Sequence, residues 1–265
     1  MEKFKYYAKK AFSLFNCMEM RILPGNVAFF FVLALFPIIT IVVGIASYFS
    51  ISLDIVVDFI HDLLPQEAGN IIIEAISGKG FDSSVGAFSL IALFAASNGT
   101  YAIINAANTL YQVEESDSLK NRIKSVLLLF ILLLLIVFLL LVPMFGEKII
   151  SLLGDSVLLE QIRFFYKLLR WPLTFFLIYV NLKLLYTIAP DKKISSKSTT
   201  YGSIFTTIIW TLATAIFGYY LKYFANYNLI YGNLSSIIIL MMWIYIISYV
   251  FVMGIAINAT NFNES

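Results

Sequence analysis

Long apolar stretches separated by short polar segments dominate the pattern of the chain. The clearest stretch runs from Val126 to Phe145 and contains no polar side chain. A helix needs about 20 consecutive apolar residues to cross the hydrocarbon core of a bilayer. Five further stretches reach this length, at about 27–49, 84–111, 170–189, 201–223 and 234–258. The pattern therefore predicts an all-α membrane protein with six transmembrane helices.

The segment before the first span has a different, amphipathic pattern. Within residues 3–21, Phe4, Phe12 and Phe15 share one helical face, and the lysines fall off it. This pattern is typical of a helix that lies on a membrane surface. Pro24-Gly25 follows it, and we expect the helix to break there, before an uncleaved first span.

Residues 52–83 form the longest polar connection, between spans one and two. Asp54, Asp58 and Asp62 recur every four residues with apolar residues between them. This spacing predicts an amphipathic helical segment with an acidic outer face. His61 lies beside the acids, but a single histidine is weak support for a metal site, so we expect a solvated face and no metal.

Lysine and arginine are distributed unequally between the two sides of the predicted bundle. The N-terminal segment and the loops after spans two and four carry eleven of them, and the opposite connections carry four. Short cytoplasmic loops are enriched in these residues. We therefore expect both termini in the cytoplasm and a single polytopic membrane domain over residues 1–265. Residues 1–25 would form its cytoplasmic interfacial segment, and residues 52–83 would be extracytoplasmic.

Composition excludes several other classes of protein. Apolar residues make up 60% of the 265 residues and charged residues 13%, against about 25% charged in soluble domains. The net charge of +2 gives no reason to expect a nucleic-acid partner. Cys17 is the only cysteine, so an internal disulfide is excluded. We expect membrane lipids as partners and no cofactor; no pattern indicates an oligomeric state.

Span two carries a polar stripe. Asn98, Tyr101, Asn105 and Asn108 are spaced three, four and three residues apart, which places them on one helical face. Asparagine is costly in lipid unless it is hydrogen-bonded. The stripe therefore either holds helices together or lines a cavity, and the sequence favours neither.

Two other polar features interrupt the apolar spans. Pro37 lies inside span one, where it predicts either a packing kink or a hinge that lines a cavity. Lys183 lies seven residues before Pro190 in span four. At 1.5 Å per residue, we expect it to snorkel to the inner interface.

Several segments resemble the YihY/BrkB family of bacterial inner-membrane proteins, which has also carried a ribonuclease label. Residues 28–37, AFFFVLALFP, resemble its first-helix motif, and Asn105-Ala-Ala-Asn108 lies where that family has an asparagine-bearing second helix. The strongest match is 219–259. The residues that carry the later motifs are Pro190, Gly202, Trp210, Tyr227, Tyr231, Gly232, Trp243, Gly254 and Asn258.

This resemblance implies six helices, cytoplasmic termini and a plasma-membrane location, and no settled activity. The chain departs from the family at two positions. Ala34 stands where the family usually has serine, and Ala256 stands where it usually has glutamate in the terminal GAELNA motif. A role of that glutamate therefore does not carry over to this chain.

Two kinds of function fit these observations. The first is a transporter, or a protein that handles lipids or envelope precursors. The second is an envelope assembly or scaffold protein that transports nothing and docks through residues 52–83. We do not expect an enzyme. Hydrolysis of phosphodiesters usually needs clustered carboxylates or histidines, and the single His61 and the acids of one small loop do not provide them.

Overall fold

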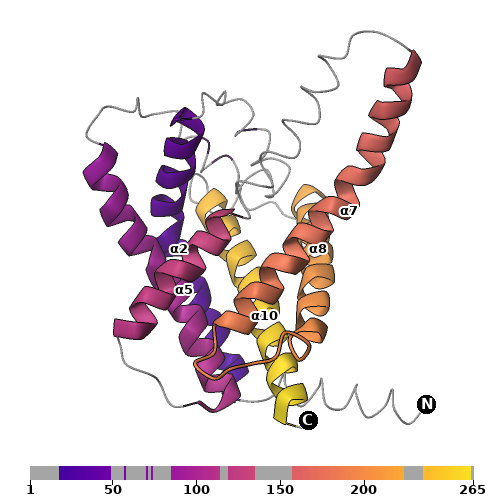
Figure 1. The fold of residues 1–265 in the computed structure, drawn as a ribbon. Coiled ribbons are helices and arrows are strands. Elements are labelled where there is room, and N and C mark those ends of the chain that lie inside the picture. The colour runs from indigo at the N-terminus through magenta and orange to yellow at the C-terminus, as the bar shows by residue number, and fades with distance from the viewer. Residues whose placement is uncertain are drawn as a thin grey trace, which may run out of the picture.

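A computed structural model describes residues 18–48, 57, 70, 73, 85–113, 119–134, 157–223 and 235–263. Within these ranges every regular element is helical (Figure 1), which confirms the expected all-α class. The long helices are α2 (Met18–Tyr48), α5 (Val85–Tyr111), a helix over residues 119–134, α7 (Val157–Ile188), α8 (Thr200–Tyr223) and α10 (Ser235–Asn263).

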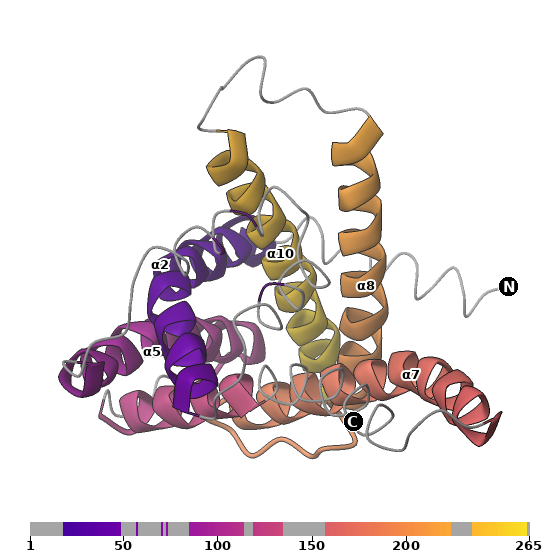
Figure 2. The same ribbon diagram turned by 90° about the horizontal axis from the view of Figure 1, so that it is seen from above.

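Helix α10 lies at the centre of the packing. It contacts α2, α5 and α8, while α2 also packs on α5 and α8 on α7. Figure 2 shows α10 between α2 and α8. Residues 250–256 of α10 are all buried, as expected of a helix that is apolar on every side and surrounded by others.

One end of the bundle gathers the helix ends that matter for the site. Figure 1 shows that α5, α7 and α10 end there and that α2 and α8 begin there. The connection over residues 189–199 lies at this end, and its Lys192, Lys193 and Lys197 are exposed. We call this end of the bundle the basic end.

Within the described residues, each predicted span coincides in position with a helix, but several of the helices are longer than the spans. Helices α5 and α8 begin and end within one residue of spans two and five. Thr200–Tyr223 and Ile237–Thr260 are long and apolar enough to cross a membrane, and Pro172–Ile188 is a shorter apolar stretch. The second half of Val126–Phe145 lies outside the described residues, as does nearly all of residues 52–83.

The expected break at Pro24-Gly25 is wrong. Helix α2 begins at Met18 and runs through both residues, so the described end of the predicted surface helix, residues 18–21, belongs to α2. A proline inside a helix costs about 3 kcal/mol. Met20, Leu23 and Val27 recur on one face and are buried in the core with Ile103 of α5. Burial of each such side chain contributes about 1.5–3 kcal/mol, which offsets the cost of the proline.

Candidate functional site

The predicted stripe on α5 extends toward the basic end, and its members have different surroundings. Asn108 is buried, whereas Asn98, Tyr101 and Asn105 are half-buried. The partners of Asn98 and Asn108 come from the 119–134 helix and from the connection between α7 and α8. The stripe therefore faces other parts of the protein at both of its ends.

Arg122 binds Asn98, at the end of the stripe that is farther from the basic end. Its Nη1 donates to Asn98 Oδ1 (2.7 Å), and its Nη2 donates to the Phe94 carbonyl (3.2 Å). The guanidinium also lies over the Phe94 ring, 3.8 Å from its centroid, a favourable cation–π arrangement. One turn along, Thr100 Oγ1 donates to the Ser125 carbonyl (2.6 Å). These contacts fix α5 against the 119–134 helix.

A charged network binds Asn108, at the end of the stripe that is nearer the basic end. Asn108 Nδ2 donates to Asp191 Oδ2 (2.8 Å), and the Asp191 backbone N–H donates to Asn108 Oδ1 (2.8 Å). Lys124 Nζ donates to Asp191 Oδ1 (2.7 Å) and to the Pro190 carbonyl (2.8 Å). Asn108, Lys124 and Asp191 therefore join α5, the 119–134 helix and the connection after α7; we call these three residues the basic-end network.

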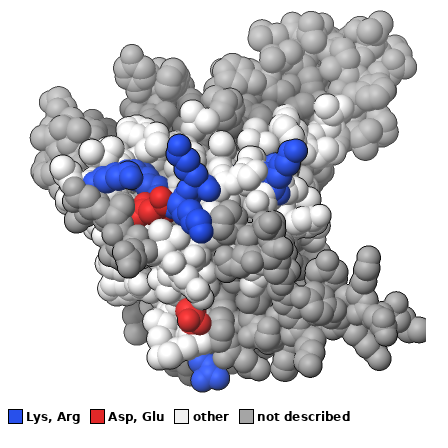
Figure 3. Space-filling view, turned by 60° about the horizontal axis from the view of Figure 1, so that its bottom comes forward, with Lys and Arg blue, Asp and Glu red and all other residues white. Residues whose placement is uncertain are grey.

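The charges of this network are largely withdrawn from solvent. The side chains of Lys124 and Asp191 are 14% and 3% exposed. Burial lowers the pKa of the Lys124 ammonium below its ordinary 10.5, and the hydrogen bond and charge of Asp191 oppose that shift. Figure 3 shows Lys and Arg side chains around an acidic patch on this face. A carboxylate among so many cations favours the ionised pair.

Asn105, between the two bonded asparagines, is different. Its Oδ1 is buried, and no donor within the described residues lies within hydrogen-bonding distance of it. A buried amide oxygen without a partner usually marks the place of a water or a ligand. The middle of the stripe therefore presents an open acceptor, while its two ends are satisfied.

Asn108 was predictable from the sequence, but its partner Asp191 and the Lys124 that binds Asp191 were not. Both occur in basic loops where charged residues are expected to be solvated. The pairing joins residues 67 positions apart, and the only local signal was that Asp191 follows Pro190 directly after a span.

Gly202, Gly254 and Asn258 of the family motifs meet where α8 crosses α10. The Gly202 N–H lies in the first turn of α8, where backbone donors have no partner within the helix, and it donates to Asn258 Oδ1 (2.8 Å). A Cβ on Gly202 would overlap the Gly254 carbonyl and the Asn258 amide. Asn258 thus caps α8 from another helix, and the two glycines permit the close approach.

Tyr186 extends this contact to α7. Its hydroxyl donates to the Phe251 carbonyl (2.9 Å) and pairs with Thr206 Oγ1 (2.8 Å). Its ring lies 4.9 Å from that of Phe251. Trp210 Nε1 donates to the Ile247 carbonyl (2.7 Å). Tyr186 carried no signal in the sequence beyond its place in an apolar span.

The other motif positions have separate surroundings. Pro37 lies within α2, which continues through it, and Pro190 contributes its carbonyl to the basic-end network. Trp243 is half-buried on α10. The two departures from the family, Ala34 and Ala256, are both buried. Tyr227, Tyr231 and Gly232 lie outside the described residues.

Within the described residues, no three His, Cys, Asp or Glu side chains lie close enough together to hold a metal ion. The polar groups of the site are amides, hydroxyls, the Arg122 guanidinium and the Lys124–Asp191 ion pair. Such groups bind polar ligands and hold helices together.

The helical fold, its apolar spans and the polar contacts between helices define an all-α membrane protein. The chain matches the family model described as "Virulence factor BrkB" over residues 11–265. It belongs to the BrkB family.

Relatives of the chain include a protein named ribonuclease-like and several named only as membrane proteins. It is 32% identical to the ribonuclease-like protein YfkH of Bacillus subtilis, covering 96% of this chain and 94% of YfkH. It is 23% identical to a UPF0761 membrane protein of Haemophilus influenzae, covering 93% and 91%. It is 25% identical to one of Aliivibrio salmonicida, covering 98% and 86%. No solved structure matches the chain.

Proposed function

We propose that this protein crosses the plasma membrane six times, with both termini in the cytoplasm, and moves or handles a lipid or an envelope precursor. The family membership and the membrane proteins among its relatives support the location. The basic end, with its exposed lysines, would face the cytoplasm, where anionic lipids attract such residues.

The buried acceptor of Asn105 is the observation that carries the proposal. The neighbouring Asn98 and Asn108 both have charged partners. These bonds hold α5 in place, and Asn105 is not needed for that. An amide oxygen that is buried between helices and has no donor is costly unless water or a polar ligand reaches it. A polar path beside α5 meets that requirement.

Cysteine accessibility tests this path. In a chain with Cys17→Ser, we expect Asn105→Cys to react with a small membrane-impermeant thiol reagent from one side of the membrane. Leu129→Cys, at a position buried among apolar side chains, and Phe130→Cys, at an exposed position of the Leu-rich helix, should not react. Protection of residue 105 from both sides in a folded protein contradicts the path.

Transport by the protein alone separates the proposal from the alternative of an assembly or scaffold protein. In liposomes that contain only this protein and a fluorescent phosphatidylglycerol, a membrane-impermeant reductant bleaches the outer leaflet alone unless lipid crosses. We expect bleaching beyond one half, and we expect Asn105→Leu to reduce its rate more than it reduces stability. Bleaching that stops at one half favours the scaffold role.

We propose no nuclease activity, although YfkH is named ribonuclease-like. Phosphodiester hydrolysis needs an activated water and usually a metal. The chain has one histidine, His61, which our topology places outside the cytoplasm.

A further inference from the structure

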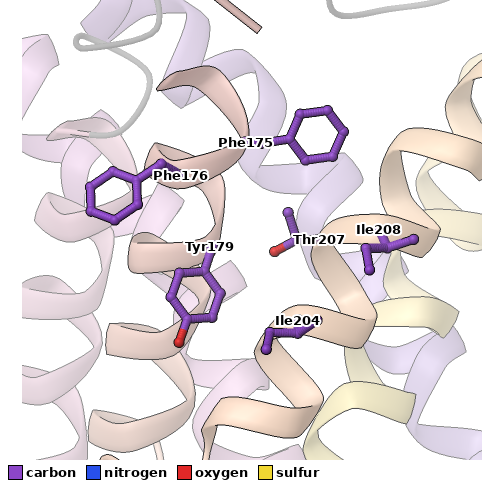
Figure 4. Close-up of a pocket in the computed structure, with 6 residues that line it drawn as sticks. All are labelled: Phe175, Phe176, Tyr179, Ile204, Thr207 and Ile208. Atoms are coloured by element: carbon purple, nitrogen blue, oxygen red, sulfur yellow. The ribbon is translucent and has the colours of Figure 1, made fainter. Parts of the chain in front are cut away.

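An apolar groove runs along the outer surface between α7 and α8. It has a volume of about 240 Å³ and is lined by Phe175, Phe176, Tyr179, Ile204, Thr207 and Ile208. Figure 4 shows Tyr179 and Ile204 on opposite sides of it, one from each helix. The Thr207 hydroxyl donates to the Ser203 carbonyl (2.8 Å), so its one donor is used within α8. The groove is therefore apolar along its length.

The lining is accessible from outside the bundle. Phe176, Ile204 and Ile208 are all exposed, and Tyr201, one turn nearer the basic end than Ile204, is 68% exposed. In a membrane protein, an exposed apolar surface contacts lipid tails. A groove in that surface fits a flexible hydrocarbon chain better than a flat face does, because the chain meets side chains on both sides.

A cation lies at one end of the groove. Lys183 follows Tyr179 by one turn toward the basic end of α7, and its Nζ donates to the Tyr179 hydroxyl (3.3 Å). Its Nζ is also 5.6 Å from the centroid of the Tyr179 ring. The ammonium is thus held against a residue that lines the groove. The exposed Lys197 lies in the turn that precedes α8, at the same end.

We propose that this groove binds one acyl chain of an anionic phospholipid, whose phosphate is held by Lys183 and the Tyr179 hydroxyl. The groove supplies the apolar contact and the lysine supplies the charge. The lysine lies at one end of the groove, as the phosphate lies at one end of an acyl chain. This inference rests on the proposed lipid-handling function and names its lipid class. A binding experiment tests it, separately from the transport assay.

The charge is tested by lipid competition. Purified protein in detergent receives an equimolar mixture of dioleoyl phosphatidylglycerol and dioleoyl phosphatidylcholine, and native mass spectrometry counts the lipids retained. We expect the unsubstituted protein to prefer phosphatidylglycerol. One lysine near a lipid surface contributes about 1 kcal/mol, so Lys183→Gln should reduce that preference about fivefold. Lys183→Arg should keep it.

Lys222 provides the matched control. It also lies beside a tyrosine, 5.3 Å from the ring of Tyr223, but at the opposite end of α8. Lys222→Gln should leave the preference unchanged. An unchanged preference in Lys183→Gln, or an equal loss in both variants, overturns the proposal, as does equal retention of the two lipids by the unsubstituted protein.

The groove itself is tested by filling it. Ile204→Trp places bulk in the groove, and Ile216→Trp places it at an exposed position elsewhere on α8. We expect one retained lipid fewer in Ile204→Trp alone; equal numbers in the two variants overturn the assignment to this groove. A protein that binds the lipid but moves none contradicts the proposed transport and leaves the binding site intact.

Discussion

At the scale of single residues, Gln112 ends α5 in a backbone conformation that most side chains avoid. Its φ is 53°. The Val113 N–H donates to the Asn108 carbonyl (2.9 Å) and the Gln112 N–H to that of Thr109 (3.2 Å). This pair of bonds is the Schellman arrangement, in which the left-handed residue is usually glycine.

Gln112→Gly should therefore raise the free energy of unfolding by about 1 kcal/mol, because glycine adopts this conformation without the steric cost of a Cβ. Unfolding in detergent measures the change. Gln112→Ala is the control, since alanine also has a Cβ and should gain nothing. Equal stabilities of the glycine and alanine variants would contradict the strain.

The ion pair of Asp191 with Lys124 gives a second prediction at this scale. Asp191→Asn leaves a largely buried ammonium without its counter-charge and should lower the free energy of unfolding by about 3 kcal/mol. The double variant with Lys124→Met should recover at least half of that loss, because no charge then remains buried. A double variant whose loss equals the sum of the single losses would mean that the two residues do not interact.

The pH dependence of the Asp191→Asn protein follows from the same pair. Asp191 opposes the lowering of the pKa of Lys124, so its removal should lower that pKa further. A lysine whose pKa is lower in the folded state costs stability while protonated, and the cost disappears as pH rises from the folded to the unfolded value. The deficit of the variant should therefore shrink as pH rises from neutral toward the ordinary lysine value of 10.5; a constant deficit contradicts this account.

At the scale of helices, glycines set how closely α8, α10 and α5 approach their neighbours. A Cβ on Gly254 would overlap Thr206 Oγ1 and the Tyr186 hydroxyl, whereas one on Gly99 would lie 3.2 Å from Phe31 Cδ1. A Cβ on Gly218 would meet nothing within 4 Å. The three positions therefore form a graded series.

We expect alanine substitutions to follow that series. Gly254→Ala should cost about 3 kcal/mol and Gly99→Ala about 1 kcal/mol, because overpacking moves neighbouring groups. Gly218→Ala should be neutral or stabilising by up to about 1 kcal/mol, since alanine favours helix. Thermal unfolding in detergent ranks the three variants. A Gly254→Ala protein as stable as the Gly218→Ala protein would contradict the close approach.

Helix positions and the ends of α5 and α8 were predictable because hydropathy reports which residues sit in lipid, but the starts of α2 and α7 were not. Span four was expected at 170–189, and α7 begins at Val157. Its additional turns are polar enough to escape a hydropathy pattern and still helical. Pro24 failed as a stop signal for a related reason, since burial of its neighbours in the core outweighs a local preference.

At the scale of the whole molecule, the candidate site was only half predictable. The stripe on α5 follows from a local period, which a sequence displays directly. Its partners Arg122 and Asp191 come from other elements, as does Lys124, which binds Asp191. The spacing along the chain does not encode which loops meet. The basic end brings Lys124 and Asp191 to Asn108 because helices α5 and α7 both end there (Figure 1).

The orientation of the bundle in the membrane gives the last prediction. The basic-end network ties the start of the 119–134 helix to the residue after Pro190, so both connections must lie on one side. The excess of lysine and arginine in them predicts that this side is the cytoplasm. Topology reporters fused after Gly80 and after Asp155 should then report outside, and one after Lys193 inside. An inside signal after Gly80 would contradict the six-span arrangement, whereas an outside signal after Lys193 would reverse its orientation.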